Sequence, residues 1–265
     1  MKLAVAATAP LGAEILERLA DKHDVEFLLT RPDRPRGRGR KVGAPPAKEA
    51  AERLGIPVRQ DERLDESFDL GGVETIVVAA YGALIPAGLL DRALWLNVHP
   101  SLLPRWRGAA PIERAVMAGD EESGVSVIRL VEELDAGPLG AQRTISIGGD
   151  TTAGDVYAET ARVGPELIDE ALANESFSPQ VGETTYAEKI GPADRELDWS
   201  RPPKELHDRI RALSPHIGAR GELHGRVVTV WRSQLAGDRL EVLEVQPEGG
   251  TRMPYEAWLR GLRSP

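Results

Sequence analysis

Two polar side chains in the segment 97-NVHPSLLPRWRGAAPI-112 have the spacing to act on one substrate. Asn97 and His99 lie two residues apart in a strand-like run, so their side chains project from the same face. Histidine transfers protons near neutral pH, and an asparagine amide donates a hydrogen bond to a developing oxyanion. Pro100 ends the run and Pro104 stiffens the chain after it. The pair is a candidate catalytic centre, and the alternative is a histidine that simply satisfies backbone carbonyls.

Asp135 is the candidate for a third catalytic group. It lies in the glycine-flanked loop 132-EELDAGPLG-140, which follows another strand-like run. A carboxylate beside an imidazole orients the ring and favours its charged form. Spacing along the chain does not establish that Asp135 meets His99, so an aspartate that caps a turn is the open alternative.

The elements that must position these side chains alternate between strand and helix. Predicted strands cover 2–7, 24–30, 56–59, 74–80, 95–99, 124–131 and 141–147, and predicted helices cover 11–22, 45–54, 89–94, 111–119 and 151–175. This alternation predicts an α/β fold with a Rossmann-like, mostly parallel open sheet and helices on both faces. Ligands of such sheets bind outside the carboxyl ends of the strands, which is where Asn97 and His99 stand.

A small second domain is expected after a polar, proline-containing stretch. We expect a catalytic domain over 1–184, a linker over 185–204 and a small β domain over 205–265. In the last part a helix is predicted near 204–213, followed by strands at 226–232 and 239–247.

Composition excludes several classes of protein. The chain has no cysteine, which excludes a disulfide framework and thiolate metal sites and permits a reducing compartment. No run reaches the roughly 18 apolar residues of a transmembrane helix. Glu14 and Glu17 follow the apolar N-terminus at helical spacing, which favours a first strand and helix over a secretory signal. We therefore expect a cytoplasmic protein without a metal and without membrane contact.

The charges are unevenly distributed. The net charge is -9, but residues 201–265 hold 11 Lys+Arg against 8 Asp+Glu, which leaves 22 against 34 for the rest. Within that acidic remainder, 31-RPDRPRGRGRK-41 carries six basic residues and one acidic residue. Its prolines and glycines predict a loop. Such a basic loop can contact phosphates while the acidic surface repels other nucleic acid, and the alternative is a solvated surface loop.

Five motifs together resemble those of the methionyl-tRNA formyltransferases. In chain order they are RPDRPRGRGRKV, VVAAYGALIP, NVHPSLLPRWRGAAPIERAVMAGDEESGV, VEELDAGP and TYAEKIGPADRELDWSRPPKELHDRIRALSP. The resemblance covers nearly the whole chain. The Asn-x-His-Pro-Ser-Leu-Leu-Pro block is shared with the wider folate-dependent formyltransferases, whereas WRGAAPI and the block at 185–215 are typical of the tRNA branch.

The resemblance implies a catalytic trio of Asn97, His99 and Asp135, with 10-formyltetrahydrofolate as the formyl donor. The acceptor amine would attack the formyl carbon, and Asn97 with protonated His99 would stabilise the oxyanion of the tetrahedral intermediate. His99, positioned by Asp135, would move the proton to the departing folate nitrogen, without a metal or a covalent enzyme intermediate. The implied folate contacts are Tyr81, Leu84, Ile85, Pro86, Ser101, Leu102, Leu103, Pro104, Glu132 and Glu133. For 101–104 a rigid packed turn is the second interpretation.

The resemblance also implies a monomer that formylates initiator methionyl-tRNA and so supports translation initiation. The basic loop would contact the acceptor arm through Arg34, Arg36, Arg38, Arg40 and Lys41. The second domain would add an auxiliary tRNA surface.

Two features depart from the family pattern. In 7-ATAPLG-12, Leu11 stands where the family has an aromatic residue near the methionyl end of the substrate. The C-terminal domain is short and lacks a hairpin of the family pattern between about Ser233 and Asp238, which predicts a reduced, open OB-like barrel.

Three other functions compete with formylation of initiator tRNA. Another amine acceptor, such as an amino sugar nucleotide or glycinamide ribonucleotide, and a catalytically inactive tRNA- or folate-binding module are the alternatives that stay open. A dinucleotide-dependent enzyme is excluded, because the first turn, AATAPLGAEIL, lacks G-x-G-x-x-G.

Overall fold

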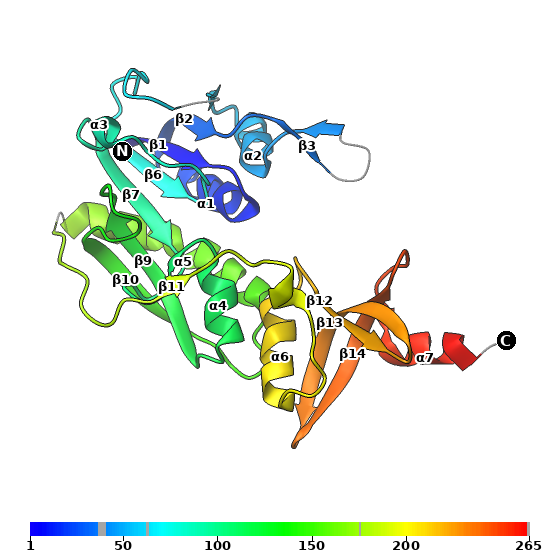
Figure 1. The fold of residues 1–265 in the computed structure, drawn as a ribbon. Helices are drawn as coiled ribbons and strands as arrows, with labels where there is room; N and C mark the ends of the chain where they lie inside the picture. Colours follow the sequence, from blue (N-terminus) through cyan, green and yellow to red (C-terminus); the bar gives the residue numbers. More distant parts are fainter. Residues whose placement is uncertain (37–40, 62–63, 175, 264–265) are drawn as a thin grey trace. The chain divides into compact units, whose positions relative to one another are not determined.

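The structure is a computed structural model, which describes residues 1–36, 41–61, 64–174 and 176–263 (Figure 1). Contacts between residues divide the chain into two units that are interleaved along the sequence. Unit 1 comprises 1–107, 124–144 and 158–185, and unit 2 comprises 108–123, 145–157 and 186–265. The domain boundaries expected at 184 and 204 remain a prediction beside this division.

A seven-stranded sheet in the order β10-β9-β7-β6-β1-β2-β5 carries the site. Its strands are β1 (Lys2–Ala7), β2 (Asp24–Thr30), β5 (Val58–Gln60), β6 (Thr75–Ala79), β7 (Leu94–His99), β9 (Glu122–Arg129) and β10 (Leu139–Ser146). The pairs from β5 through β2, β1 and β6 to β7 are parallel, and β7 pairs with β9 in the antiparallel direction. The predicted α/β class with a mostly parallel open sheet is confirmed.

Three helices lie on one face of this sheet. α1 (Pro10–Ala20) begins on a proline, which suits the first helical turn, and buries the apolar stripe that contains Ile15. α2 (Pro46–Leu54) lies beside α1. α5 (Ala153–Asn174) reaches the sheet through Gly164, where an added Cβ would lie 2.9 Å from Val98 Cγ1. Val98 of β7 therefore faces α5.

The opposite face of the sheet holds Trp95, which is buried in a cluster with Phe27 and Ile76. The four-residue helix α3 (Ala87–Leu90) and the segment 64–73 contribute the side chains that cover this cluster. Side chains alternate along a strand, so Asn97 and His99 share the face of Trp95 and point away from α5.

At Gly12, helix α1 packs closely on the ends of β1 and β6. A Cβ added to Gly12 would lie 2.4 Å from the carbonyl oxygen of Ala79 and 2.7 Å from Cβ of Ala7. Only glycine allows α1 to pack this closely on β1 and β6.

Two local predictions are wrong. No helix spans 89–94, because α3 ends at Leu90, and the carbonyl of the buried Leu89 accepts a hydrogen bond from Trp95 Nε1 at 2.8 Å. That bond turns the chain directly into β7. The basic block is not wholly a loop, since β3 (Arg34–Arg36) and β4 (Lys41–Gly43) form an antiparallel ribbon. Pro35 pairs with Val42 in this ribbon, so its proline sits on a two-stranded edge.

Unit 2 contains a four-stranded antiparallel sheet, in the order β12-β13-β14-β15. Its strands are β12 (Ala219–Leu223), β13 (Arg226–Ala236), β14 (Arg239–Pro247) and β15 (Met253–Pro254). β13 and β14 are joined by a short turn at Gly237, which has φ +60°. This turn lies where the sequence analysis expected a missing hairpin. Within the described residues the sheet is open, with β12 and β15 at its edges, as the predicted reduced domain requires. β12 had no predicted counterpart.

The core of unit 2 combines separated stretches of sequence. α6 (Pro203–Ala212) packs Ile210 against sheet residues and against Trp258 of α7 (Tyr255–Arg263), a helix that was not predicted. Met117 of α4 (Pro111–Met117) joins the same cluster. On α6, the Nε2 atom of His207 lies 2.9 Å from the carbonyl of Gly149. The remaining elements are β8 (Arg107–Gly108), β11 (Tyr186–Ala187) and the 3-10 helix η1 (Ala193–Arg195).

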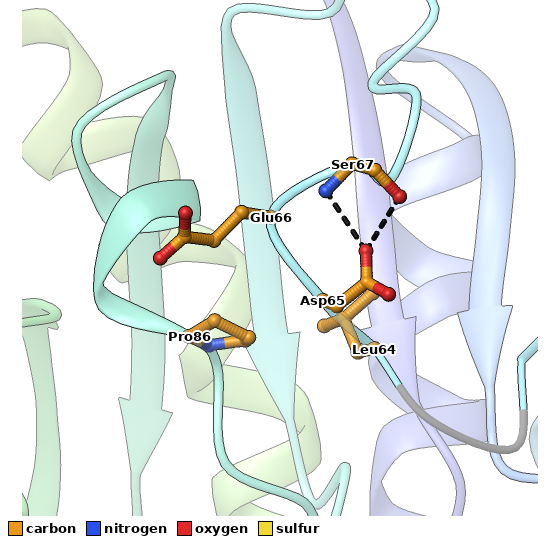
Figure 2. A pocket seen from close by; sticks show the side chains of 5 residues that line it. All are labelled: Leu64, Asp65, Glu66, Ser67 and Pro86. Atoms are coloured by element: carbon orange, nitrogen blue, oxygen red, sulfur yellow. Dashed lines mark hydrogen bonds between the residues drawn. The ribbon is translucent and has the colours of Figure 1, made fainter.

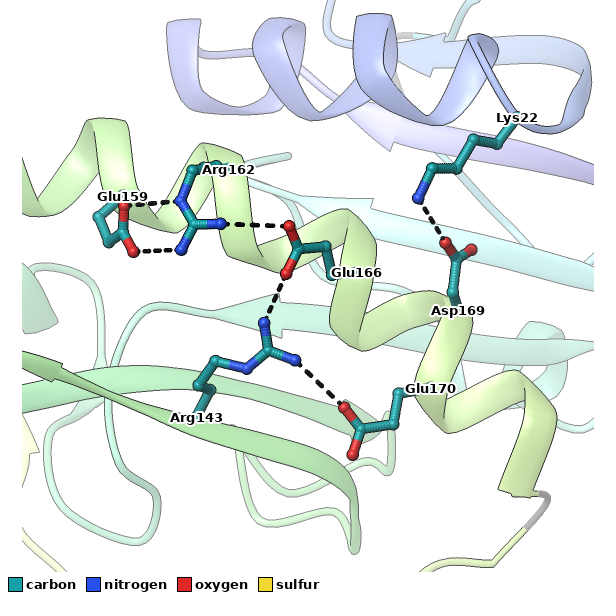
Figure 3. A network of polar contacts seen from close by, with 7 residues as sticks. All are labelled: Lys22, Arg143, Glu159, Arg162, Glu166, Asp169 and Glu170. Carbon is teal, nitrogen blue, oxygen red and sulfur yellow. Dashed lines mark hydrogen bonds and ion pairs between the residues drawn. The ribbon is translucent and has the colours of Figure 1, made fainter.

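Polar contacts fix α5 to its neighbours in unit 1 (Figure 3). Arg143 of β10 pairs with Glu166 and Glu170 of α5 and so joins the strand to the helix, while Arg162 pairs within α5 with Glu159 and Glu166. The Arg162 hydrogen bonds lower the pKa of Glu159 from its ordinary value. These side chains are largely solvated, so they add specificity of packing more than stability.

Candidate active site

Asn97, His99 and Asp135 lie together in unit 1. Asn97 Nδ2 donates to Asp135 Oδ1 at 3.5 Å, and His99 Nδ1 lies 3.6 Å from Asp135 Oδ2. His99 is 4% exposed and Asp135 is 8% exposed, whereas Asn97 is half-buried. An amide, an imidazole and a carboxylate therefore share a largely desolvated position where each interaction is strengthened.

The other ring nitrogen of His99 faces the backbone. His99 Nε2 lies 3.0 Å from the carbonyl oxygen of Trp106. A carbonyl only accepts, so Nε2 carries a proton and Nδ1 is the atom that gains or loses one. His99 thus contacts a backbone carbonyl, as the alternative interpretation requires, and it also faces a carboxylate, while its catalytic role stays a prediction. Nothing in the sequence indicated the contact with the Trp106 carbonyl.

Asp135 reaches His99 because the loop after β9 folds back over the face of β7. Asp135 has φ +51°, a left-handed conformation that aspartate tolerates better than most residues. The return is tight at Gly137, where an added Cβ would lie 1.7 Å from the carbonyl oxygen of Arg129. The amide of Arg129 in turn donates to the Pro138 carbonyl at 3.0 Å. This geometry depends on tertiary contacts that spacing alone did not indicate.

The segment 101–104 forms a packed turn. Ser101 Oγ donates to the Arg105 carbonyl at 2.7 Å, and Ser126 Oγ donates to the Ser101 carbonyl at 2.6 Å. The amide of Leu103 donates to Ser126 Oγ at 3.2 Å. Ser101, Leu103 and Pro104 are buried and Leu102 is half-buried, so the second interpretation of this segment describes its structure, and a folate contact remains a prediction.

The other predicted folate residues lie in two loops. In the first, Tyr81 is buried, and burial raises the pKa of its hydroxyl. Leu84 is 84% exposed, and Ile85 and Pro86 are half-buried. In the second loop, Glu132 and Glu133 are exposed.

A cavity of about 520 Å³ opens beside the first of these loops (Figure 2). It is lined by Leu64, Asp65, Glu66, Ser67 and Pro86. Pro86 is the only lining residue among the predicted folate contacts, and none belongs to the trio. The carboxylate of Asp65 accepts from the amide and hydroxyl of Ser67, at 2.8 and 2.6 Å, so one wall is a self-contained turn.

The predicted tRNA-binding residues are only partly described. Arg34 is exposed in β3, and Arg36 pairs with Lys41 in the β3–β4 backbone register. Arg38 and Arg40 lie outside the described residues. The base of the ribbon is anchored by Asp33, which accepts from Lys48 Nζ at 2.9 Å.

Three residues near the trio were missed by the sequence analysis: Arg107, Gln180 and Thr185. Gln180 Nε2 donates to the carbonyl oxygen of Asp135 at 2.7 Å, and Arg107 donates to Gln180 Oε1. Thr185 Oγ1 accepts from the amide of Trp106 at 2.9 Å. Gln180 and Thr185 contact main-chain atoms, which leave no pattern in a single sequence, and Arg107 reaches the loop of Asp135 through the side chain of Gln180.

Among the described residues, no three or more His, Cys, Asp and Glu side chains are grouped closely enough to hold a metal ion. In the same part of the chain, no helix is both long and apolar enough to cross a membrane.

The sequence of the chain matches one family of known proteins. Residues 1–172 match the family model described as formyl transferase, and residues 189–239 match the formyl transferase C-terminal domain. A methionyl-tRNA formyltransferase of Heliobacterium modesticaldum is 37% identical over 309 aligned residues, covering 99% of this chain and 98% of that protein.

Two solved structures share the fold. A methionyl-tRNA formyltransferase from Clostridium thermocellum superposes with a TM-score of 0.69 at 15% identity, covering 93% of this chain and 98% of that one. HypX from Aquifex aeolicus, solved in complex with tetrahydrofolic acid, superposes with a TM-score of 0.65 at 18% identity, covering 97% of this chain and 46% of that one. The chain belongs to the formyltransferase family, alongside the enzymes named methionyl-tRNA formyltransferase.

Proposed function

We propose that this protein transfers the formyl group of 10-formyltetrahydrofolate to the α-amino group of initiator methionyl-tRNA, in the cytoplasm. The observation that carries the proposal is the meeting of Asn97, His99 and Asp135 at one buried position. The match to a methionyl-tRNA formyltransferase over 99% of the chain supports the acceptor.

The three side chains divide the work between charge and proton. Asn97 donates a hydrogen bond to the formyl oxygen as negative charge develops there. His99 keeps its Nε2 proton on the Trp106 carbonyl, so it exchanges the proton of the attacking amine at Nδ1. Asp135 faces that edge of the ring and stabilises the imidazolium. When bound, the folate would supply the formyl group: the acceptor amine forms a bond to the formyl carbon, the bond from that carbon to the folate nitrogen breaks, and this nitrogen takes the proton that the amine loses.

Two loops of unit 1 offer surfaces for a flat, partly apolar donor. Leu84 is 84% exposed in the loop after β6, and Leu134 is 55% exposed beside Asp135. Exposed apolar side chains on two loops give a ring system surfaces to pack against, while backbone groups of 81–86 and 132–135 offer hydrogen bonds. We assign these loops to the folate.

Acceptor choice is the decisive experiment. The protein is supplied with 10-formyltetrahydrofolate and, separately, with charged initiator tRNA, charged elongator tRNA or an amino sugar nucleotide. We expect formylation of the initiator tRNA alone at a useful rate. Transfer to the sugar nucleotide instead would replace the acceptor in this proposal, and no transfer to any amine would indicate a binding module.

A further inference from the structure

Gln180 connects a buried cation to the backbone of the loop that carries Asp135. Its Nε2 donates to the carbonyl oxygens of Asp135 at 2.7 Å and of Gly137 at 2.8 Å. Its Oε1 accepts from Arg107 Nη2 at 2.9 Å and from Nε at 3.2 Å. The half-buried amide thus bridges two carbonyls on one side and a guanidinium on the other.

The partners of Gln180 permit one amide orientation only. A guanidinium has donors and no acceptor, and a carbonyl has no donor. A flipped amide would therefore place its NH₂ against Arg107 and its oxygen against the two carbonyls. Arg107 is 9% exposed and also donates to Glu133 Oε1 at 3.1 Å, so its own position is fixed from a second side.

Thr185 acts on His99 through the backbone of Trp106. Its Oγ1 accepts from the amide of Trp106 at 2.9 Å, and its carbonyl accepts from the amide of Arg107 at 2.9 Å. Trp106 has φ +63°, an uncommon conformation for a bulky side chain. The carbonyl of this same residue accepts from His99 Nε2. Thr185 therefore holds the peptide that fixes the ring of His99.

We propose that Gln180 and Thr185 are positioning residues for this reaction, a role that rests on the proposed function. Gln180 holds the backbone of Asp135, and Thr185 holds the backbone of Trp106. Both protein groups next to the imidazole are thus set by one stretch of six residues. Each of the two residues in left-handed conformation, Asp135 and Trp106, is a point where the chain would relax if released.

The first test uses a matched pair of variants at Thr185. Thr185→Val keeps the shape but removes the acceptor for the Trp106 amide, whereas Thr185→Ser keeps the hydroxyl. We expect Thr185→Val to lower kcat by on the order of tenfold, with KM for both substrates unchanged, because the effect falls on groups acting in the transition state. Thr185→Ser is expected to restore most of kcat. Equal kcat values for all three proteins would overturn the role of Thr185.

The second test reverses the polarity at Gln180. Gln180→Glu still accepts from Arg107 but turns an oxygen toward the carbonyls of Asp135 and Gly137. We expect kcat to fall by on the order of ten- to a hundredfold and the pH–rate profile to change shape, since Asp135 moves relative to His99. Val181→Ala, at the neighbouring side chain that is 87% exposed, is the control that keeps wild-type values. A Gln180→Glu enzyme with a wild-type profile would overturn the proposal for Gln180.

A spectroscopic readout separates this inference from the proposed function. In ¹⁵N-histidine NMR, the His99 ring is identified by the signal lost in His99→Gln and is expected in the Nε2-protonated form. Thr185→Val should shift that signal, and Thr185→Ser should not. This holds even if wild-type protein formylates no tested acceptor, which would reject the function alone. An unchanged His99 signal in folded Thr185→Val would overturn the positioning role.

Discussion

At the scale of single residues, the site pairs an ordinary strand motif with two unusual backbone conformations. Asn97 and His99 need only the alternation of β7 to share a face. Asp135 and Trp106 are non-glycine residues at φ +51° and +63°, conformations that cost roughly 1–3 kcal/mol each when strained. The hydrogen bonds around them offset that cost, and they direct one carboxylate and one carbonyl at the same imidazole.

Asn97→Ala tests the amide. The substitution removes the donor expected to act on the formyl oxygen, so kcat should fall by on the order of a hundredfold or more with little change in KM. Steady-state kinetics with initiator methionyl-tRNA measure this, and His99→Ala should give a loss of similar size. Turnover equal to wild type in either variant would remove that residue from the mechanism.

The sequence predicted the half of the site that depends on local geometry. Strand alternation predicted that Asn97 and His99 share a face, and the flanking glycines predicted that Asp135 lies in a loop. The contact between Asp135 and His99 spans 36 positions of sequence and depends on how the loop folds over β7. Gln180 and Thr185 contact backbone carbonyls and amides of their partners, and a contact with a backbone group leaves no residue pattern in a single sequence. Their roles therefore could not be predicted without coordinates.

At the scale of elements, the turn after β9 has room for one residue type at Gly137. A side chain there would collide with the Arg129 carbonyl, with only 1.7 Å between Cβ and oxygen. The loop would have to lift off the end of β9, and Asp135 lies two residues away. The position of the Asp135 carboxylate therefore depends on the contact between the loop and the end of β9 as well as on the loop itself.

Gly137→Ala should consequently lower both activity and stability. We expect a loss of about 1–3 kcal/mol in the free energy of unfolding, together with a kcat loss larger than that of a comparable substitution at exposed Gly149. Urea denaturation and steady-state kinetics measure the two effects. A Gly137→Ala enzyme as active as Gly149→Ala would show that the loop tolerates displacement.

Within unit 2, the ion pair between Arg114 and Asp194 joins α4 to η1. Arg114 Nη1 and Nη2 donate to the two oxygens of Asp194 at 2.7 and 2.9 Å. These hydrogen bonds lower the pKa of the Asp194 carboxyl, against an opposing effect of burial, and the amide of Gly191 adds to the shift. A depressed carboxyl pKa stabilises the fold above the unfolded-state value and loses that contribution as pH falls through the folded-state value.

Asp194→Asn keeps an acceptor for Gly191 but removes the charge. At pH 7 we expect the variant to be less stable by about 1 kcal/mol, the size of a well-formed, partly buried pair. The difference should shrink as pH falls below about 4, the ordinary pKa of an aspartate, towards the lower pKa of the folded-state carboxyl. Urea midpoints of both proteins at pH 7, 5 and 3.5 measure it. A stability gap that persists unchanged at pH 3.5 would exclude the charge as its cause.

At the scale of the whole molecule, positive charge is concentrated in one short block of an otherwise acidic chain. The chain carries a net charge of -9, yet its basic block holds six positive charges, and Arg34 in β3 is exposed. An acidic surface repels nucleic acid in general, so we expect contact with tRNA phosphates at the basic elements.

Salt dependence of tRNA binding tests that division. We expect the logarithm of the affinity to fall linearly with the logarithm of salt concentration, and Arg34→Gln to reduce the slope by about one phosphate contact. Arg162→Gln, which removes the same charge within the α5 network, is the matched control and should leave the slope unchanged. Filter binding at several salt concentrations measures this slope. A wild-type slope near zero would contradict the predicted phosphate contacts.

The interleaving of the two units limits how this sequence can be recombined. Met117 of α4 and Ile210 of α6 belong to one hydrophobic cluster, although the 124–144 stretch of unit 1 is threaded between them in the chain. A chimera that crosses over to a relative after residue 185 would therefore inherit α4 from one parent and its packing partners from the other. Functional hybrids should be recovered when 108–123 and 145–157 are exchanged together with everything after 185, because these three stretches make up unit 2.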